Sequence, residues 1–251
     1  MSPTGHDSHA APILFISDLH LDPQRPGIIR LFADFLATEA TAAGAVYILG
    51  DLFEAWIGDD AISGDEPPLR ALHGLTRRGV PVRVMRGNRD FLLGERFAEL
   101  TGVELLPDPS VIRIDGAPVA LAHGDALCTD DQDYQRFRAM VRDPAWQDEF
   151  LARPLAEREA YARQAREQSS ARNERLDDTL MDVNPQAVAE LMREQGVRTL
   201  IHGHTHRPAI HRLELEGHPA ERIVLGDWYD QGSVLRWHRG AHRLSSLPLG
   251  D

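Results

Sequence analysis

Five short apolar runs, each followed at once by polar residues, constrain the fold of this chain most strongly. They are PILFIS (12–17), AVYIL (45–49), VPVRVM (80–85), PVALA (118–122) and RTLI (198–201). Short, bounded runs rich in β-branched residues are typical of buried strands. Apolar residues recur at helical spacing between them, over 27–44 and 67–79. Strands that alternate with helices predict an α/β fold, a β-sandwich flanked by helices.

The two remaining parts of the chain have different patterns. Residues 212–248 alternate and contain turn glycines, which predicts hairpins that continue a second sheet in antiparallel fashion. From about 126 to 190 there is no strand-like run, and NPQAVAELMREQG has an N-cap asparagine, a first-turn proline and a closing glycine. We therefore predict one domain over 12–251 with a helical lid inserted at about 126–190. The polar stretch 1–11 is interpreted as a disordered lead-in.

Composition narrows the possible partners. The net charge of −12 over 251 residues argues against a general affinity for nucleic acid, because nucleic-acid binders usually present a basic face. A single cysteine, Cys128, is typical of a reducing compartment. No apolar run approaches the ~20 residues of a membrane-spanning helix. We expect a cytoplasmic protein, monomeric and without a nucleic-acid partner.

Residue types that bind metal ions follow every predicted core strand. Ligands gather at the carboxyl ends of strands in open α/β sheets, so these clusters should converge in space. The candidate donors are Asp18, His20, Asp51, Asn88, His123, His204 and His206. Seven donors are too many for one ion, which predicts two ions that share Asp51. We assign Asp18, His20 and His206 to one ion. Asn88, His123 and His204 are assigned to the other.

The donor set also indicates the chemistry. Nitrogen and oxygen ligands without thiolate favour Mn²⁺, Fe or Mg²⁺-like ions over a structural zinc. Two ions about 3.5–4 Å apart generate hydroxide and clamp the oxygens of an in-line displacement, which predicts hydrolysis of a phosphate ester or anhydride. Arg89 is predicted to bind phosphate oxygens. His202 is interpreted as a packed strand residue or a partner of a ligand, whereas Asp90 and Asp125 are either partners of ligands or turn formers.

Several longer phrases resemble known proteins. DLH, GDLFEAWIGDD, GNRDFLLG, HGDALCTDD and HGHTHRP resemble the motifs of the calcineurin-like metallophosphoesterases, from Ile13 to about Leu249 apart from the helical insertion. Within that superfamily YILGDLFEAWIGDD, GNRDFLLGERFAE, HGDALCTDDQDYQRFR and MDVNPQAV are similar to the UDP-2,3-diacylglucosamine hydrolase family of the lipid A pathway.

This resemblance implies hydrolysis of the diphosphate of UDP-2,3-diacylglucosamine to UMP and 2,3-diacylglucosamine 1-phosphate (lipid X), by attack of a metal-bound hydroxide on the UMP-side phosphorus. It also implies two Mn²⁺ ions per chain, a helical lid, and a peripheral position on the cytoplasmic side of the inner membrane. Asn88, Arg89 and His123 would be catalytic, and the first two would contact the diphosphate together with His204. Asp131, Ser169 and Asn173 would hold the head group.

One departure and two alternatives accompany this interpretation. The family often has a lysine where this chain has Leu176, and Arg175 is one residue out of register. The alternatives are a metallophosphoesterase acting on another phosphodiester or phosphomonoester, and a non-catalytic scaffold of the same fold.

The apolar lid residues either pack the lid against the core or contact acyl chains; they are Trp146, Phe150, Leu151, Leu155 and Tyr161. Six arginines against four glutamates within 153–175 suggest a patch that attracts anions.

Overall fold

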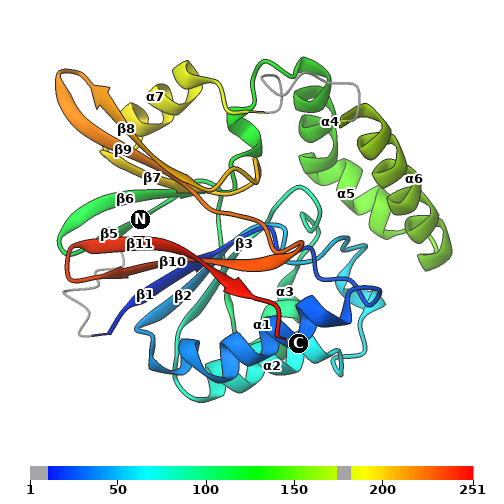
Figure 1. The fold of residues 1–251 in the computed structure, drawn as a ribbon. Helices are drawn as coiled ribbons and strands as arrows, with labels where there is room; N and C mark the ends of the chain where they lie inside the picture. The colour runs from blue at the N-terminus through cyan, green and yellow to red at the C-terminus, as the bar shows by residue number, and fades with distance from the viewer. Residues whose placement is uncertain (1–10, 174–181, 251) are drawn as a thin grey trace.

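The fold is taken from a computed structural model, which describes residues 11–173 and 182–250. The predicted lead-in therefore lies almost wholly outside the described residues, as do Arg175 and Leu176. Two mixed sheets stack face to face (Figure 1). The first has the order β11-β10-β1-β2-β3-β4 and the second the order β5-β6-β7-β9-β8.

The strands of the first sheet are β1 Ile13–Ile16, β2 Ala45–Leu49, β3 Val82–Met85, β4 Glu104–Leu106, β10 Gln231–His238 and β11 Ala241–Pro248. Strands β1 to β4 pair in parallel, and β10 joins β1 antiparallel with Ile13 opposite Trp237. The strands of the second sheet are β5 Ser110–Ile114, β6 Ala117–Ala122, β7 Thr199–His202, β8 Ala209–Leu215 and β9 His218–Val224. There β6, β7 and β9 are parallel.

Helices cover both outer faces of the sandwich. The first sheet is covered by α1 Pro26–Ala37, α2 Pro67–Arg77 and α3 Glu95–Thr101, and the second by α7 Pro185–Glu194 (Figure 1). Strand β1 shows why its run is apolar throughout. Leu14 and Ile16 pack toward the helices, whereas Ile13 and Phe15 pack between the sheets. A strand buried on both faces has no polar alternation.

Three further helices stand to one side of the sandwich, close to the carboxyl ends of the strands (Figure 1). They are α4 Gln132–Arg142, α5 Pro144–Leu151 and α6 Leu155–Asn173, and we call them the lid. Asp131 and Asp143 cap α4 and α5 by accepting hydrogen bonds from Tyr134 N and Trp146 N. None of the helices in the described residues is long and apolar enough to cross a membrane.

The outcome of the fold prediction is mixed. The five predicted core runs form β1, β2, β3, β6 and β7, and the α/β class with helices on both sides of a sandwich is confirmed. Strands β4 and β5 were not anticipated. The prediction that 212–248 continues the second sheet was wrong for its second half, because β10 and β11 belong to the first sheet. The predicted antiparallel hairpin in the second sheet is confirmed for β8 and β9, although β9 joins that sheet through parallel pairing with β7.

Candidate metal centre and lidded cleft

The structure brings the seven predicted donors together from both sheets. Asp18 and His20 follow β1, Asp51 follows β2 and Asn88 follows β3, all in the first sheet. In the second sheet His123 follows β6, and His204 and His206 follow β7. The convergence at the seam between the sheets arises because β1, β2, β3, β6 and β7 all end at this edge of the sandwich.

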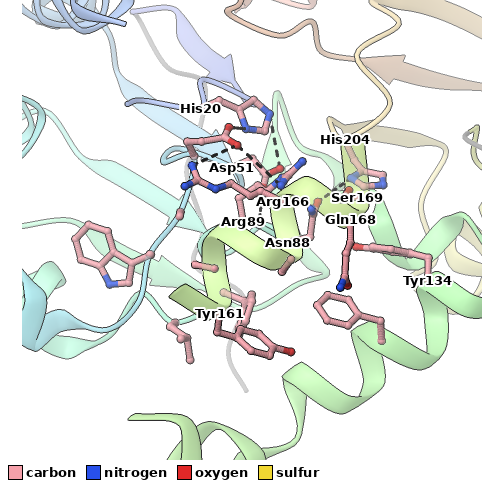
Figure 2. Close-up of a pocket in the computed structure, with 18 of the residues that line it drawn as sticks. His20, Asp51, Asn88, Arg89, Tyr134, Tyr161, Arg166, Gln168, Ser169 and His204 are labelled. Atoms are coloured by element: carbon pink, nitrogen blue, oxygen red, sulfur yellow. Dashed lines mark hydrogen bonds and ion pairs between the residues drawn. The ribbon is translucent and has the colours of Figure 1, made fainter. Parts of the chain in front are cut away.

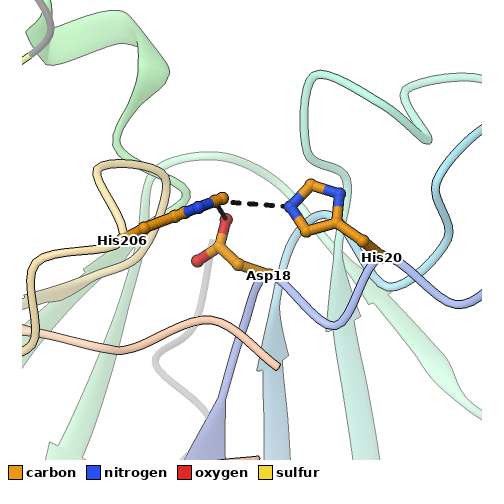
Figure 3. A group of neighbouring side chains, drawn as sticks. All are labelled: Asp18, His20 and His206. Atoms are coloured by element: carbon orange, nitrogen blue, oxygen red, sulfur yellow. Dashed lines mark hydrogen bonds and ion pairs between the residues drawn. The ribbon is translucent and has the colours of Figure 1, made fainter. Parts of the chain in front are cut away.

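Asp18, His20 and His206 form a first cluster, shown in Figure 3. The two imidazoles turn their Nε2 atoms toward each other at 3.3 Å. The Nε2 atom of His206 is 3.4 Å from Asp18 Oδ1. Asp18 is fully buried, which raises its pKa, but the hydrogen bond and charge of His206 hold that pKa well below its usual range. The cluster thus presents an ionised carboxylate and two imidazoles to one point.

Asn88, His123 and His204 form a second cluster beside the first. Asn88 Oδ1 lies 2.9 Å from His123 Nε2 and 2.9 Å from His204 Nδ1. Asp51 lies between the clusters, with Oδ1 at 3.7 Å from His123 Nε2 and Oδ2 at 3.8 Å from His20 Nε2. Buried carboxylates need compensating positive charge, and nitrogen and oxygen donors without thiolate suit hard or borderline divalent cations. The residues present therefore fit a pair of divalent ions.

The backbone is strained at five of the seven donors. Asp18, His20, Asp51, His204 and His206 have φ angles between 48° and 67°, in the left-handed region. Non-glycine residues there cost on the order of 1–3 kcal/mol each and persist where the surroundings over-determine them, which is common at functional sites. The sharp turn at each strand end aims these side chains into the seam.

Two glycines beside the donors are needed for space and do more than mark turns. A Cβ on Gly87 would lie 2.1 Å from Asp51 Oδ1, and one on Gly203 would lie 2.3 Å from Asp18 Oδ2. Those carboxylates also accept backbone hydrogen bonds, from Arg89 N at 2.8 Å and from His204 N at 3.0 Å. Any side chain at either glycine would displace a donor.

Asp90 and Asp125 each accept hydrogen bonds that join separate segments around the donors, which favours the role of a partner of the ligands over that of a turn former. Asp90 accepts from Leu52 N at 2.8 Å and Gly87 N at 2.7 Å, which joins the loops that carry Asp51 and Asn88. Burial, and then the charge of Asp51, raises the pKa of Asp90 to about 6. Asp125 Oδ2 accepts from Arg138 Nε at 2.8 Å and from the hydroxyl of Tyr134 at 3.0 Å. Asp125 therefore ties α4 of the lid to the metal edge.

His202 lies outside both clusters. Its ring is fully buried on β7, with Nδ1 2.9 Å from Gly203 O and Nε2 3.4 Å from an Arg222 nitrogen. Burial lowers the pKa of His202 to about 4, so the ring is neutral at pH 7. It supports the strand before the turn that presents His204 and His206.

A cleft of about 790 Å³ runs from the metal edge under the lid. Its polar end is lined by Arg89, Asp131 and Ser169 together with five of the seven candidate ligands, which are His20, Asp51, Asn88, His204 and His206. Figure 2 shows His20, Asp51, Asn88 and His204 at this end beside Arg89 and Ser169. Its other end is lined by aromatic rings, Trp56, Phe91, Phe137, Phe150 and Tyr161. Asn173 is the last residue of α6, and its side chain lies outside the description. A cleft with this division fits an amphipathic ligand.

Comparison with known proteins identifies the family. A family model described as "Calcineurin-like phosphoesterase" matches residues 11–208. The chain is a calcineurin-like phosphoesterase. It is 55% identical over 242 residues to "UDP-2,3-diacylglucosamine hydrolase" of Stenotrophomonas maltophilia (strain K279a), over 93% of this chain and 98% of that protein. It is 54% identical over 244 residues to the protein of the same name from Xanthomonas axonopodis pv. citri (strain 306), over 94% and 99%. The phosphoesterase belongs to the same family as these relatives.

The lid of this phosphoesterase is anchored by an arginine that is 2% exposed, Arg158. Its guanidinium donates to Ile57 O at 2.6 Å and to both carboxylate oxygens of Asp60. Arg158 therefore cannot belong to an exposed patch that attracts anions, which corrects part of that expectation. Arg166 of α6 also faces the core, with Nη1 3.7 Å from Asp22 Oδ2.

The lid aromatics of the phosphoesterase serve in packing and in the cleft at once. Phe150 is buried in the core cluster of the first sheet and also lines the cleft. Trp146 stacks on it with centroids 4.9 Å apart, and Tyr161 meets its edge at 5.4 Å. Leu151 and Leu155 are exposed. The packing interpretation is thus confirmed for Phe150 and Tyr161, and contact with acyl chains stays a prediction for the same two side chains.

Sequence reasoning missed Tyr134 at the site. Its ring lies 5.8 Å from the ring of His204 and lines the cleft, and its hydroxyl bonds Asp125 as described above. The sequence signal was weak, because the place of Tyr134 in the first turn of α4, three residues after the N-cap Asp131, does not show which way its ring points.

We predict that the single thiol of the phosphoesterase is inert while the chain is folded. Burial, and then the nearby charge of Asp125, raises the pKa of Cys128 to about 12, so only about 10⁻⁴ of the thiol is ionised at pH 8. Iodoacetamide should label it at least ~10²-fold more slowly in native protein than in urea-unfolded protein, as measured by intact mass. Equal rates would contradict the burial of this side chain.

Proposed function

We propose that this chain hydrolyses the diphosphate of UDP-2,3-diacylglucosamine and releases UMP and 2,3-diacylglucosamine 1-phosphate (lipid X) in lipid A biosynthesis. One observation supports this most directly. A cleft that is polar at the metal edge and aromatic beneath the lid matches a substrate with a diphosphate at one end and acyl chains at the other. The relatives named for this activity, at 52–55% identity, support the same substrate.

In this proposal two Mn²⁺ ions bind at the seam, one held by Asp18, His20 and His206 and the other by Asn88, His123 and His204, with Asp51 shared. When bound, the ions supply an activated water and neutralise charge on the diphosphate oxygens. Water would attack the phosphorus on the UMP side.

The chain's own side chains position the diphosphate. Arg89 lies in the cleft next to Asn88, and a guanidinium suits the paired oxygens of a phosphate. Its backbone N–H donates to Asp51, which fixes the backbone of Arg89 relative to the metal edge. Its guanidinium lies beside Glu54, with Nη1 3.9 Å from Oε1. Asp131 and Ser169 line the cleft from the lid side, where the proposal places the glucosamine head group with Asn173.

The lid excludes water and receives the acyl chains. Phe150 and Tyr161 are held by their neighbours in the lid, and Trp56 lines the same cleft from the core. Burial of a hydrocarbon chain against these rings favours binding. The entropy cost is small, because the rings are already held in place before the ligand binds. We propose that the chain works as a monomer, peripheral on the cytoplasmic side of the inner membrane, with no nucleic-acid partner.

The test is hydrolysis of UDP-2,3-diacylglucosamine by metal-stripped protein, with Mn²⁺ added back. UDP-N-acetylglucosamine and an aryl phosphodiester serve as comparison substrates. Mn²⁺-dependent release of UMP from the diacylated substrate alone is the expected result. Hydrolysis of the aryl ester alone would keep the phosphoesterase chemistry and refute the lipid substrate.

A further inference from the structure

Two carboxylates outside the seven donors lie behind the histidines of the first cluster. Glu54 Oε2 is 3.1 Å from Nδ1 of His20. Asp227 Oδ2 is 3.2 Å from Nδ1 of His206. Glu54 lies in the loop after β2, and Asp227 lies between β9 and β10. Each imidazole therefore has a carboxylate at one nitrogen and turns its other nitrogen toward the opposite ring.

The chemistry of imidazole gives this arrangement a consequence. A neutral ring carries its proton on one nitrogen and a lone pair on the other, and only the lone pair binds a metal. A carboxylate at Nδ1 holds the proton there, leaves the lone pair at Nε2 and fixes the plane of the ring. Two imidazoles that bind one ion must turn their lone pairs toward the same point. The Nε2 atoms of His20 and His206 meet this condition, because they face each other at 3.3 Å (Figure 3).

His20 depends on Glu54 in particular. Its Nδ1 atom is buried and makes no hydrogen bond among the described residues, and Glu54 Oε2 lies 3.1 Å away from it. Glu54 is thus the acceptor within reach. The ring is otherwise held by apolar contact, stacked on Tyr229 with 5.2 Å between centroids and 8° between planes. Stacking fixes the plane but cannot select the tautomer.

The second cluster is held differently, which provides an internal comparison. Nδ1 of His123 lies 2.9 Å from the backbone oxygen of Leu49, so the group at this nitrogen is part of the backbone and is no carboxylate. His204 turns Nδ1 itself toward the seam, at Asn88. Loss of either carboxylate should therefore affect one ion and spare the other.

We propose that Glu54 and Asp227 are positioning residues that set the tautomer and orientation of His20 and His206 for the first ion. The proposal rests on the proposed metal assignment. Glu54 has a further connection, because Arg89 Nη1 and Arg166 Nη1 each lie 3.9 Å from its Oε1. Glu54 thereby links the first ion to the phosphate-binding arginine and to the lid.

The experiment measures metal binding without substrate. Mn²⁺ is titrated into metal-stripped wild type, Glu54→Gln, Asp227→Asn and Asp22→Asn, and free ion is followed by its electron paramagnetic resonance signal. Asp22→Asn is the matched control, because Asp22 also loses one charge beside Arg166 but the structure gives it no contact with a metal-cluster histidine. Wild type and control should bind two ions. Each of the other two variants should keep one ion and bind the second about 10–100-fold more weakly.

A second signature comes from the same samples. Two Mn²⁺ ions that share a carboxylate give an exchange-coupled spectrum, so at low metal the two amide variants should show the spectrum of an isolated ion instead. Unchanged affinity for both ions would overturn the proposal, and so would equal weakening of both sites or an equal loss in Asp22→Asn. Failure of the wild type to bind two ions would refute the dimetal assignment itself. The isosteric amides on two separate loops keep the test valid if one variant fails to fold.

Discussion

Asp51→Ala is expected to abolish hydrolysis, with kcat lower by about 10³-fold or more, which corresponds to roughly 4 kcal/mol of transition-state stabilisation. The carboxylate of Asp51 faces both clusters, at 3.7 Å from His123 and 3.8 Å from His20. Its removal takes a shared ligand from both proposed ions at once, while the remaining six donors stay in place. Release of UMP from UDP-2,3-diacylglucosamine under saturating Mn²⁺ measures the effect.

A control is needed, because removal of any carboxylate changes the charge of the chain. Asp34→Ala provides it, since Asp34 is exposed on α1 and away from the metal edge. This variant should retain normal turnover. If Asp51→Ala turned over within tenfold of wild type while still folded, the shared-carboxylate mechanism would be wrong.

The second large effect is expected at Arg89. Arg89→Ala should lower kcat/KM by about 10²–10³-fold, because a charge-assisted contact to the diphosphate that strengthens in the transition state is lost. The backbone N–H of Arg89 that binds Asp51 remains in the variant, so the metal edge should keep its geometry. Steady-state kinetics on the diacylated substrate would show the loss, and Mn²⁺ stoichiometry should remain unchanged.

Arg89→Lys separates charge from shape. Lysine keeps the positive charge but binds phosphate through one point rather than through a planar pair of donors, so partial recovery is expected. Full recovery would show that charge alone matters at this position. A loss of bound Mn²⁺ in Arg89→Ala would instead place the role of Arg89 at the metal edge.

The parts of the fold that could be predicted are those encoded locally. Strands buried on both faces appear as continuous apolar runs, and β1, β2, β3, β6 and β7 were found in this way. The sheet to which β10 belongs could not be read from its pattern. Val234 faces the helix layer and Leu235 faces the space between the sheets, so the strand is apolar on both faces and would suit either sheet. Pairing with β1 decides this, and pairing depends on the whole chain.

The same division holds at the candidate site. Donors at strand ends could be located because the direction of a parallel strand already tells where its end lies. The groups that support them come from elsewhere in the chain. Glu54 and Asp227 lie in loops without periodicity, and Arg166 reaches the core only because α6 folds back over the cleft. Neither spacing nor propensity carries information about such contacts.

Because the donors come from both layers of the sandwich, two metal ions at the seam would act as a non-covalent crosslink between two sheets whose shared interior is a cluster of apolar side chains. By thermodynamic linkage, each ion present at about 1,000 times its dissociation constant would add roughly 4 kcal/mol to the stability of the folded state. The free energy of unfolding then becomes a function of divalent-cation activity. The side chains proposed to bind the ions would then also set how firmly the two halves of the protein hold together.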